Sequence, residues 1–319
     1  MVPMPRPSSP TAGCDVEVLT TAGELGEHLA ARRAAGCRVG LVPTMGALHD
    51  GHRSLMGRSV AECDVTVVTI FVNPLQFGDA ADLEHYPRTP EADLAVCDAS
   101  GVDVVFAPRV EEMYPCWPGP PSTTVQVGAL GARWEGQSRP GHFDGVATVV
   151  AKLFAMAGPC RAYFGEKDFQ QLAIVRRMAA DLSFPVTVVG CRTVREPGGL
   201  ALSSRNARLG AAERTAATAL WRALTAGQAA LAAGERRPAA IASAMARVVD
   251  EEPLVTLDYA AAVDAADLEV PASIEAHVPL RLLVAGRVGP VRLIDNCAAL
   301  VCAIGADAPV RVGSFAGGR

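Results

Sequence analysis

Short apolar runs alternate with helix-like stretches over roughly the first 190 residues, and this alternation constrains the possible folds most strongly. The run at 65–72 consists of eight β-branched or apolar residues, which is typical of a strand buried on both faces. Further strands are predicted at 38–42, 102–106, 161–164 and 186–189, and helices at 23–35, from Asp50 onward, and at 90–99, 146–157 and 168–181. This pattern predicts an α/β fold with a doubly wound parallel sheet, in which ligands bind at the carboxyl ends of the strands.

The character of the chain changes after Asn206, where alanine-rich helical stretches are followed by strand-like segments. The helices are expected at 211–233 and 238–250, the strands at 256–263, 280–284 and 291–294, and a hairpin turn at 287–290. We therefore expect a second, smaller α+β domain. The predicted division is a disordered tail at 1–14, an α/β domain at 15–192 and a C-terminal α+β lid domain at 193–314, before a frayed end at 315–319.

The charge of the chain argues against some classes of partner. Its 319 residues include 29 Lys or Arg and 34 Asp or Glu, so the formal net charge is −5. A mildly acidic chain is not expected to bind nucleic acid or an anionic membrane as its main task, but it can still contain a local basic pocket. Lys152 and Lys167 are the only lysines, and all other cationic side chains except histidine are arginines. At these two positions we therefore expect the compact ammonium group of lysine to be required.

The cysteine pattern indicates the compartment. The nine cysteines are widely spread, odd in number and never spaced C-x-x-C, which favours a reducing cytoplasm over a disulfide framework or a zinc ribbon. No apolar stretch approaches the ~20 residues that a membrane helix needs. The first fourteen residues hold four prolines and no apolar core of a signal peptide. We expect a cytoplasmic protein.

A histidine pair follows the predicted strand at 38–42. The segment at 45–52 reads Met-Gly-Ala-Leu-His-Asp-Gly-His, so His49 and His52 share a face of the first helical turn. The helix dipole and free N–H groups favour a phosphate there, and the glycines let the backbone approach it. A capped turn with two incidental histidines is the alternative. A zinc site is another, but H-x-x-H alone lacks a third ligand.

A second strand-to-helix junction carries Phe-Gly-Glu-Lys-Asp at 164–168. Lys167 at a helix start opposes the helix dipole unless an anion binds beside it. Asp168 is suited to cap the helix, to bind a sugar hydroxyl or to bind a metal. A charged surface turn is the alternative interpretation of this segment.

Further segments offer polar groups to small ligands. The sequence Leu-Ser-Ser-Arg-Asn at 202–206 presents two hydroxyls and a guanidinium at the domain junction, where a loop can close over a triphosphate. Asn73 and Gln76 follow the strand at 65–72, and Gln170 and Gln171 follow Lys167. Their amides bind hydroxyls and carboxylates without adding charge. The segment Arg139-Pro140-Gly141-His142 is either an anion contact or an ordinary loop.

In this order, the segments resemble those of the pantothenate synthetases (pantoate–β-alanine ligases). The similarity runs from about Val39 to Asn296 and includes Tyr86-Pro87-Arg88-Thr89. The His-Asp-Gly-His segment alone indicates only the wider nucleotidyltransferase class. The resemblance implies a Rossmann-like nucleotidyltransferase domain that binds nucleotide and pantoate, ATP and Mg²⁺ as substrate and cofactor, and a homodimer.

The resemblance also implies a two-step ligation in pantothenate (vitamin B5) and coenzyme A biosynthesis. ATP and (R)-pantoate form pantoyl adenylate and pyrophosphate, and the amine of β-alanine then displaces AMP to give pantothenate. A cofactor adenylyltransferase and a non-catalytic nucleotide sensor are the alternatives. The Asn-Pro-Leu-Gln setting of Gln76 favours the ligase, and a sensor has little need of groups directed at developing charge.

Roles for single residues follow from the resemblance alone. It implies that His52 is the proton donor, with His49, Lys167 and Arg205 as further catalytic groups. Gln76 and Gln171 are implied to bind pantoate, and Gln76 also β-alanine. The implied ATP-binding residues are Met45, Gly46, Ala47, Leu48, His49, Asp50, Gly51, His52, Gly165, Glu166, Lys167, Asp168, Val194, Leu202, Ser203, Ser204 and Arg205.

The chain departs from the family pattern in two places. Arg53 stands where an aliphatic residue is more usual, and the proline-rich extension before residue 15 is longer than expected. Neither departure touches the motifs. The protein ligands of Mg²⁺ are unknown from the sequence, and Asp93 and Glu166 are candidates.

Overall fold

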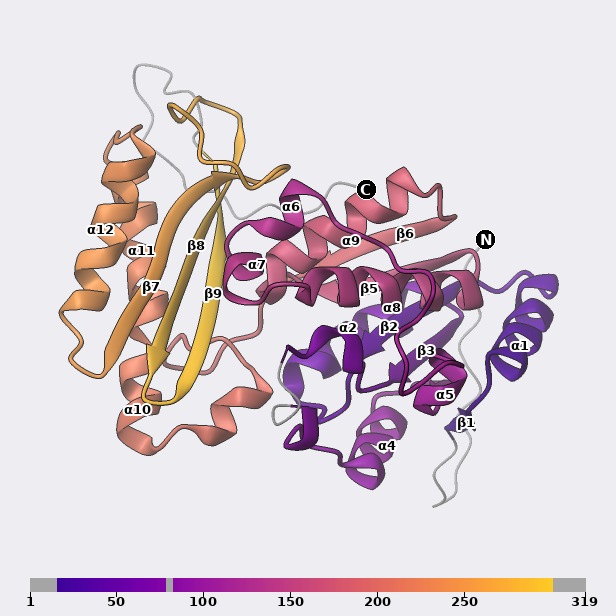
Figure 1. Cartoon of the computed structure of the whole chain (residues 1–319). Coiled ribbons are helices and arrows are strands. Elements are labelled where there is room, and N and C mark those ends of the chain that lie inside the picture. Colours follow the sequence, from indigo (N-terminus) through magenta and orange to yellow (C-terminus); the bar gives the residue numbers. More distant parts are fainter. Residues whose placement is uncertain (1–15, 79–82, 301–319) are drawn as a thin grey trace.

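The structure is a computed structural model that describes residues 16–78 and 83–300. These residues form an α/β domain and a smaller α+β domain that lie side by side (Figure 1), so the predicted fold class is confirmed. The predicted tail at 1–14 and the predicted frayed end at 315–319 lie outside the described residues. Within the described ranges, no helix has the length and apolar character needed to cross a bilayer.

Six parallel strands form the central sheet of the larger domain, in the order β1-β4-β3-β2-β5-β6. They are β1 (Glu17–Leu19), β2 (Val39–Thr44), β3 (Val65–Ile70), β4 (Val104–Phe106), β5 (Cys160–Gly165) and β6 (Val186–Cys191). The chain winds outward from β2 through β3 to β4 and returns on the other side of β2 with β5. The order therefore reverses between β2 and β5.

The strands at this switch point pair only briefly. Gly40 pairs with Arg161 and Leu41 with Ala162, whereas β2 and β3 pair over six residues. Beyond Leu41 and Ala162, the carboxyl ends of β2 and β5 continue without pairing to each other. A crevice between the two strand ends is the expected consequence.

Helices cover both faces of the sheet. One face carries α1 (Ala22–Ala34), α8 (His142–Ala157) and α9 (Phe169–Asp181), and the other carries α2 (Asp50–Glu62) and α4 (Pro90–Ala99). Neighbouring residues of β2 divide between the two cores: Leu41 packs with α1 and α8, and Val42 packs with α2 and α4. Because strand residues alternate between faces and both faces are covered, the central strands β2 and β3 are mainly apolar.

Short helical segments connect these elements and bear on the site. They are η1 (Pro74–Gln76), α5 (Val110–Met113), α6 (Ala129–Ala132), α7 (Glu135–Ser138), η2 (Glu166–Asp168) and η3 (Ser204–Arg208).

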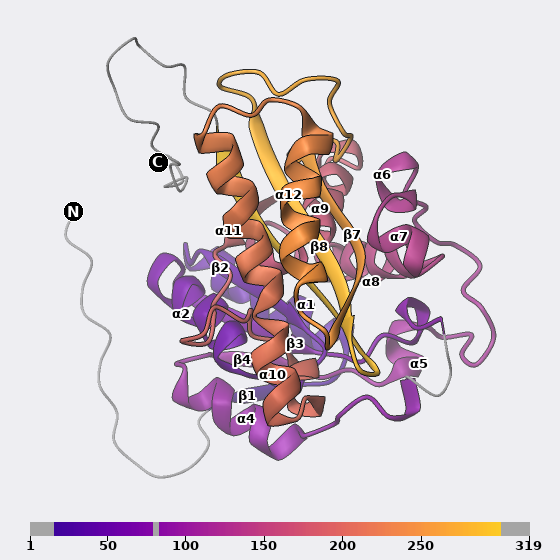
Figure 2. The ribbon, with the colours of Figure 1, turned by 90° about the vertical axis from the view of Figure 1, so that its left-hand side faces the viewer.

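The smaller domain is a three-stranded antiparallel sheet with helices on its outer face (Figure 2). Its elements are α10 (Ala211–Ala217), α11 (Ala219–Ala232), α12 (Pro238–Asp250), β7 (Val255–Asp264), β8 (Pro279–Val288) and β9 (Val291–Leu300). On one face of this sheet Leu282 packs against α11 and α12. Val263 and Leu283 instead belong to the core that contains α8 and α9 of the larger domain. Apolar burial thus joins the two domains.

Most predicted elements are present, and the differences occur mainly at their ends. The three-residue β1 was missed because two of its residues are exposed and it forms no apolar run. β3 ends at Ile70 rather than at residue 72, because the chain then turns into η1 with Asn73 as its N-cap. The helix predicted from 168 starts at Phe169, after the 3₁₀ turn η2.

Helix α8 begins at His142, before the predicted start at 146, because the left-handed Gly141 (φ +76°) makes the turn into the helix. The helix predicted over 211–233 is divided at Thr218 into α10 and α11. The hairpin strands β8 and β9 are longer than predicted, because they pair over their whole lengths up to the turn at Gly289.

Close packing of α8 on η1 leads to a stability prediction. A Cβ atom at residue 145 would lie 2.2 Å from the carbonyl oxygen of Leu75. We expect Gly145→Ala to lower the free energy of unfolding by about 1–3 kcal/mol in urea denaturation, as overpacking does. Gly57 is the matched control, because it is exposed within α2 and a Cβ atom there would have no neighbour within 4 Å. Gly57→Ala should raise stability by about 0.5–1 kcal/mol, and effects of the same sign would contradict the packing argument.

Candidate active site

A cavity of about 240 Å³ opens at the carboxyl ends of β2, β3 and β5 and extends to the segment after β6. Most of the residues predicted to contact substrates line it: Met45, His49, Gly51, His52, Gln76, Gly165, Lys167, Asp168, Gln171, Val194, Leu202, Ser203, Ser204 and Arg205. Of the remaining predicted ATP-binding residues, Gly46, Ala47, Leu48, Asp50 and Glu166 are not among its lining residues. Groups predicted from separate segments of the sequence therefore meet in one cavity.

The two histidines are held in a defined orientation by backbone hydrogen bonds. His49 is the N-cap of α2, and its ring centroid lies 4.1 Å from that of His52. The N–H of Gly51 donates to Nδ1 of His49 (3.1 Å), and the N–H of His49 donates to Nδ1 of His52 (3.2 Å). Because both Nδ1 atoms accept, the hydrogen of each neutral ring is on Nε2, where it can be donated to a ligand.

Burial keeps both rings neutral near pH 7. It lowers the pKa of His52 to about 3, and the charge of His49 acts in the same direction. The pKa of His49 is also lowered, first by burial and then by the charge of Lys167. The two Nε2–H groups are therefore available as hydrogen-bond donors on uncharged rings.

The loop before α2 is fixed by a buried carboxylate. Asp93, on α4, accepts from the N–H groups of Ala47 (3.0 Å) and Leu48 (2.8 Å) and is 2% exposed. Gly46 adopts φ +81°, and a Cβ atom there would lie 2.9 Å from Asp93 Oδ2. Each Asp93 oxygen accepts one hydrogen bond from the loop, so this buried carboxylate anchors it.

A network of amides sets the orientation of Gln76. The buried Asn73 donates from Nδ2 to Gln76 Oε1 (3.0 Å) and to the carbonyl of Gly145 (3.0 Å). Its own Oδ1 accepts from the hydroxyl of Tyr114 (2.8 Å). Gln76 Nε2 lies 2.9 Å from the sulfur of Met45. Since Nε2 carries two hydrogens, one remains for a ligand in the cavity.

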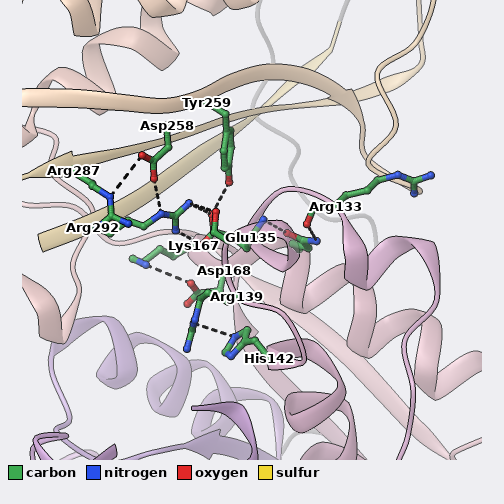
Figure 3. A network of polar contacts seen from close by, with 12 residues as sticks. Arg133, Glu135, Arg139, His142, Lys167, Asp168, Asp258, Tyr259, Arg287 and Arg292 are labelled. Atoms are coloured by element: carbon green, nitrogen blue, oxygen red, sulfur yellow. Dashed lines mark hydrogen bonds and ion pairs between the residues drawn. The ribbon is translucent and has the colours of Figure 1, made fainter. Parts of the chain in front are cut away.

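The main chain of Gln76 is held by the segment that the sequence left undecided. His142 Nδ1 lies 2.8 Å from the Gln76 carbonyl oxygen, and Arg139 Nη2 donates to the same atom (3.2 Å). Arg139 Nη1 lies 3.2 Å from His142 Nε2 (Figure 3). Burial, followed by the charge of Arg139, lowers the pKa of His142 to about 4. Arg139 and His142 therefore support the Gln76 turn.

Cationic groups also line the cavity. Lys167 Nζ lies 3.4 Å from Asp168 Oδ1 (Figure 3). Burial raises the pKa of Asp168, but the charges of Lys167 and Arg205 outweigh it and hold that pKa below its ordinary value. Ser203 caps η3 by accepting from the N–H of Arg205 (3.3 Å), so the hydroxyl sets the backbone from which the guanidinium extends.

The two glutamines after Lys167 have different surroundings. Gln171 lines the cavity, whereas Gln170 donates to the carbonyls of Leu130 and Arg133 and accepts from the N–H of Glu135. Gln170 thus binds the chain before α7. Glu166, the other candidate metal ligand, pairs with Arg281 of the smaller domain at 3.2 Å. Within the described residues, no group of three or more His, Cys, Asp or Glu side chains is arranged to hold a metal ion.

The domain interface beside the cavity is strongly polar (Figure 3). Glu135 on α7 accepts from both terminal nitrogens of Arg292 (2.6 and 2.8 Å) and from the hydroxyl of Tyr259 (2.8 Å). Asp258 accepts from Nε of the same guanidinium (2.6 Å). A bidentate, shielded ion pair fixes both partners in one geometry. The interface therefore restrains the smaller domain beside Lys167 and Asp168.

Comparison with known families agrees with this arrangement. Residues 17–298 match the family model of the pantoate–β-alanine ligases. The chain belongs to this family. A pantothenate synthetase of Roseiflexus castenholzii is 53% identical over 273 residues, which cover 86% of this chain and 96% of that protein. Another, of Paenarthrobacter aurescens, is 52% identical over 295 residues and covers 87% and 98% of the two chains.

Solved structures of the pantoate–β-alanine ligase family have the same fold. The crystal structure of pantothenate synthetase from Thermus thermophilus superposes with a TM-score of 0.81 at 47% identity, covering 88% of this chain and 99% of that one. The pantoate–β-alanine ligase of Francisella tularensis, described as complexed with β-γ ATP and β-alanine, gives 0.70 at 29% identity and covers 88% and 97%.

Several supporting residues escaped the sequence analysis or were given other roles in it. Asn73 lines the cavity, as its predicted place beside the substrates requires, and its Nδ2 donates to Gln76 and to the Gly145 carbonyl. Asp93 was considered for Mg²⁺, and Arg139 and His142 were left as an anion contact or a loop. These roles depend on contacts between distant segments, which no local pattern encodes. The only local signal was the position of Asn73 and Gln76 directly after a buried strand.

The buried His142 gives a prediction for the pH dependence of stability. Its pKa is about 4 in the folded chain and about 6.5 when unfolded. Between these values the unfolded state binds the extra proton, so this residue makes the free energy of unfolding fall as pH drops from about 6.5 to about 4. His142→Gln keeps a donor for the Gln76 carbonyl but does not titrate. We expect urea denaturation to show a flatter pH profile for the variant in this window, by at most about 1.4 kcal/mol per pH unit; identical profiles would disprove the assignment.

Proposed function

We propose that the chain catalyses the ATP-dependent condensation of (R)-pantoate with β-alanine, through pantoyl adenylate, to give pantothenate, AMP and pyrophosphate. Membership of the pantoate–β-alanine ligase family supports the overall reaction. The observation that carries the proposal is one cavity that brings His49, His52, Lys167 and Arg205 together with Gln76 and Gln171. Donors for a triphosphate thus lie beside neutral amides for a small hydroxy acid.

The first step requires an anion to attack an anion. The carboxylate of pantoate attacks the α-phosphorus of ATP, and pyrophosphate leaves with the bond electrons. Lys167 and Arg205 are placed to offset the charge on the phosphates, and the Nε2–H groups of His49 and His52 to donate to their oxygens. Gln76 and Gln171 orient the carboxylate without neutralising it, so it remains nucleophilic while the cavity holds it in line.

In the second step the amine of β-alanine attacks the carbonyl carbon of the adenylate. The C–O bond to AMP breaks, and the amine loses a proton as the amide forms. We assign to Gln76 the binding of both pantoate and β-alanine. Its side chain is fixed by Asn73 and its main chain by His142, so its amide has a defined orientation. The relative from Francisella tularensis, described with an ATP compound and β-alanine bound, supports both ligands here.

The donor groups in the cavity fit Mg²⁺ bound mainly through phosphate. Asp168 contributes a half-exposed carboxylate beside Lys167, and Mg²⁺ commonly uses one or two carboxylates together with substrate phosphates and water. When bound, the ion supplies positive charge to the triphosphate. The homodimer and the cytoplasmic location remain part of the proposal, the first from family resemblance and the second from the cysteine pattern.

An assay with each substrate omitted in turn tests the function. With pantoate and ATP alone, pyrophosphate should form only up to the amount of enzyme, because pantoyl adenylate stays bound. Adding β-alanine should give continuous AMP and pantothenate. Formation of ADP, or a nucleotidyl group retained in the final product, would refute the ligase and indicate another nucleotide-dependent enzyme.

The two lysines provide a matched test of the phosphate site. Lys167 lines the cavity, whereas Lys152 lies on α8 with Nζ 6.0 Å from the ring centroid of Tyr114. We expect Lys167→Ala to lower turnover by ~10²–10³, the loss typical of one transition-state charge stabiliser. Lys152→Ala should stay within twofold of wild type. Steady-state AMP formation measures both, and a Lys167 variant with near-normal turnover would remove this residue from the phosphates.

A further inference from the structure

The turn that carries Lys167 is held by two side chains of the smaller domain, Asn296 and Arg281. Asn296 on β9 donates from Nδ2 to the carbonyl of Lys167 (2.7 Å) and to the carbonyl of Glu166 (3.0 Å). Asn296 is 4% exposed, so these contacts are shielded from water. Both hydrogens of its Nδ2 are therefore used on the η2 backbone, next to the side chain that lines the cavity.

The orientation of this amide is determined by its neighbours. Its Oδ1 accepts from Nε of Arg281 (2.6 Å), which can only donate, and its Nδ2 faces carbonyl oxygens, which can only accept. Arg281 is itself buried, pairs with Glu166 at 3.2 Å and stacks over Phe169 at 4.0 Å. Asn296 thus binds the backbone of η2, and Arg281 binds the side chain of Glu166.

The backbone of Asn296 is fixed as well. Its N–H donates to Asp295 Oδ1 (2.7 Å), and its carbonyl accepts from Nη2 of Arg195 (3.3 Å). Arg195 also makes a bidentate pair with Asp295, at 2.5 and 2.9 Å. Arg195 directly follows Val194, which lines the cavity. The segment of Val194 and the η2 turn are therefore both bound to Asp295 and Asn296 of β9.

We infer that Asn296 is a positioning residue that fixes the ammonium of Lys167 at the phosphates, an inference that rests on the proposed function. η2 is a short 3₁₀ turn whose N-cap, Gly165, makes no side-chain cap, so its own hydrogen bonding fixes it weakly. The Asn296 amide restrains the carbonyls of Glu166 and Lys167, which lie on either side of the Lys167 Cα atom, and Arg281 Nη2 adds a longer hydrogen bond (3.4 Å) to the first of them. Asn296 itself touches no reacting atom in this scheme and acts through Lys167.

A double-mutant cycle separates positioning from a general structural role. Asn296→Asp keeps the shape and the acceptor for Arg281 but removes both donors to η2. We expect it to slow single-turnover formation of pantoyl adenylate at saturating ATP and pantoate by roughly 10- to 100-fold, the size of a displacement of about 1 Å. In the Lys167→Ala background the same change should cost less than twofold, because the group that it positions is gone.

Two further variants control for misfolding and for weakened contact between the domains, either of which could also slow the reaction. Asn296→Ser retains one neutral donor and should show a smaller loss, again absent in the Lys167→Ala background. Tyr259→Phe removes one hydrogen bond across the same interface, to Glu135, without touching η2, and should remain within twofold of wild type. The inference is overturned if the Asn296 variants lose the same factor in both backgrounds, or if Tyr259→Phe is as slow as Asn296→Asp.

The rate of the wild-type chain separates failure of the proposed function from failure of the role assigned to Asn296. If the wild-type chain forms no pantoyl adenylate, the proposed function fails and the inference fails with it. If it forms adenylate and Asn296→Asp forms it within twofold of the same rate, only the role of Asn296 is wrong.

Discussion

The site depends on the way in which β2 and β5 part at the switch point of the sheet. They pair at only two residues, and their carboxyl ends then run on separately. Pro43 and Thr44 on β2, and Phe164 and Gly165 on β5, consequently line a cavity instead of continuing the ladder. Each of these strand ends leads directly to one of the candidate site motifs, the histidine pair after β2 and the lysine turn after β5. The reversal of strand order therefore brings together groups that are more than a hundred residues apart.

Neutral donors and cations line the same cavity. The histidine rings are buried and neutral, with pKa values lowered by burial, and the amides of Gln76 and Gln171 carry no charge. The cations are Lys167 and Arg205, and the carboxylate of Asp168 partly offsets their charge. This combination suits a reaction in which a carboxylate has to approach a phosphate. A cation paired with the attacking carboxylate would stabilise the nucleophile in its ground state, and the barrier to attack would rise accordingly.

The sequence predicted the fold class and most of the elements because they depend on local patterns. The apolar runs at 38–42 and 65–72 and the helix starts at Asp50 and Pro90 are examples. The roles of the candidate site residues stay predictions, although the cavity gathers most of them. The sequence did not predict the loop anchor Asp93, the Gln76 support by His142 or the Asn296 contacts. Each of these joins residues at least 45 apart along the chain, and a pattern within one segment carries no information about such a partner.

Asn296 and Arg281 of the smaller domain position residues of the site and are not themselves assigned to the reaction. Glu166 illustrates the point, because it belongs to the Gly-Glu-Lys-Asp segment and yet is not among the cavity-lining residues. A carboxylate facing the phosphates there would repel them. Pairing with the buried Arg281 holds this carboxylate outside the cavity and leaves Lys167 and Asp168 as the η2 side chains that line it. The same ion pair satisfies a guanidinium that would otherwise be buried without a counter-charge. The Arg281–Glu166 pair thus acts together with Asn296 on the direction of η2, and it also affects the balance of charge at the cavity.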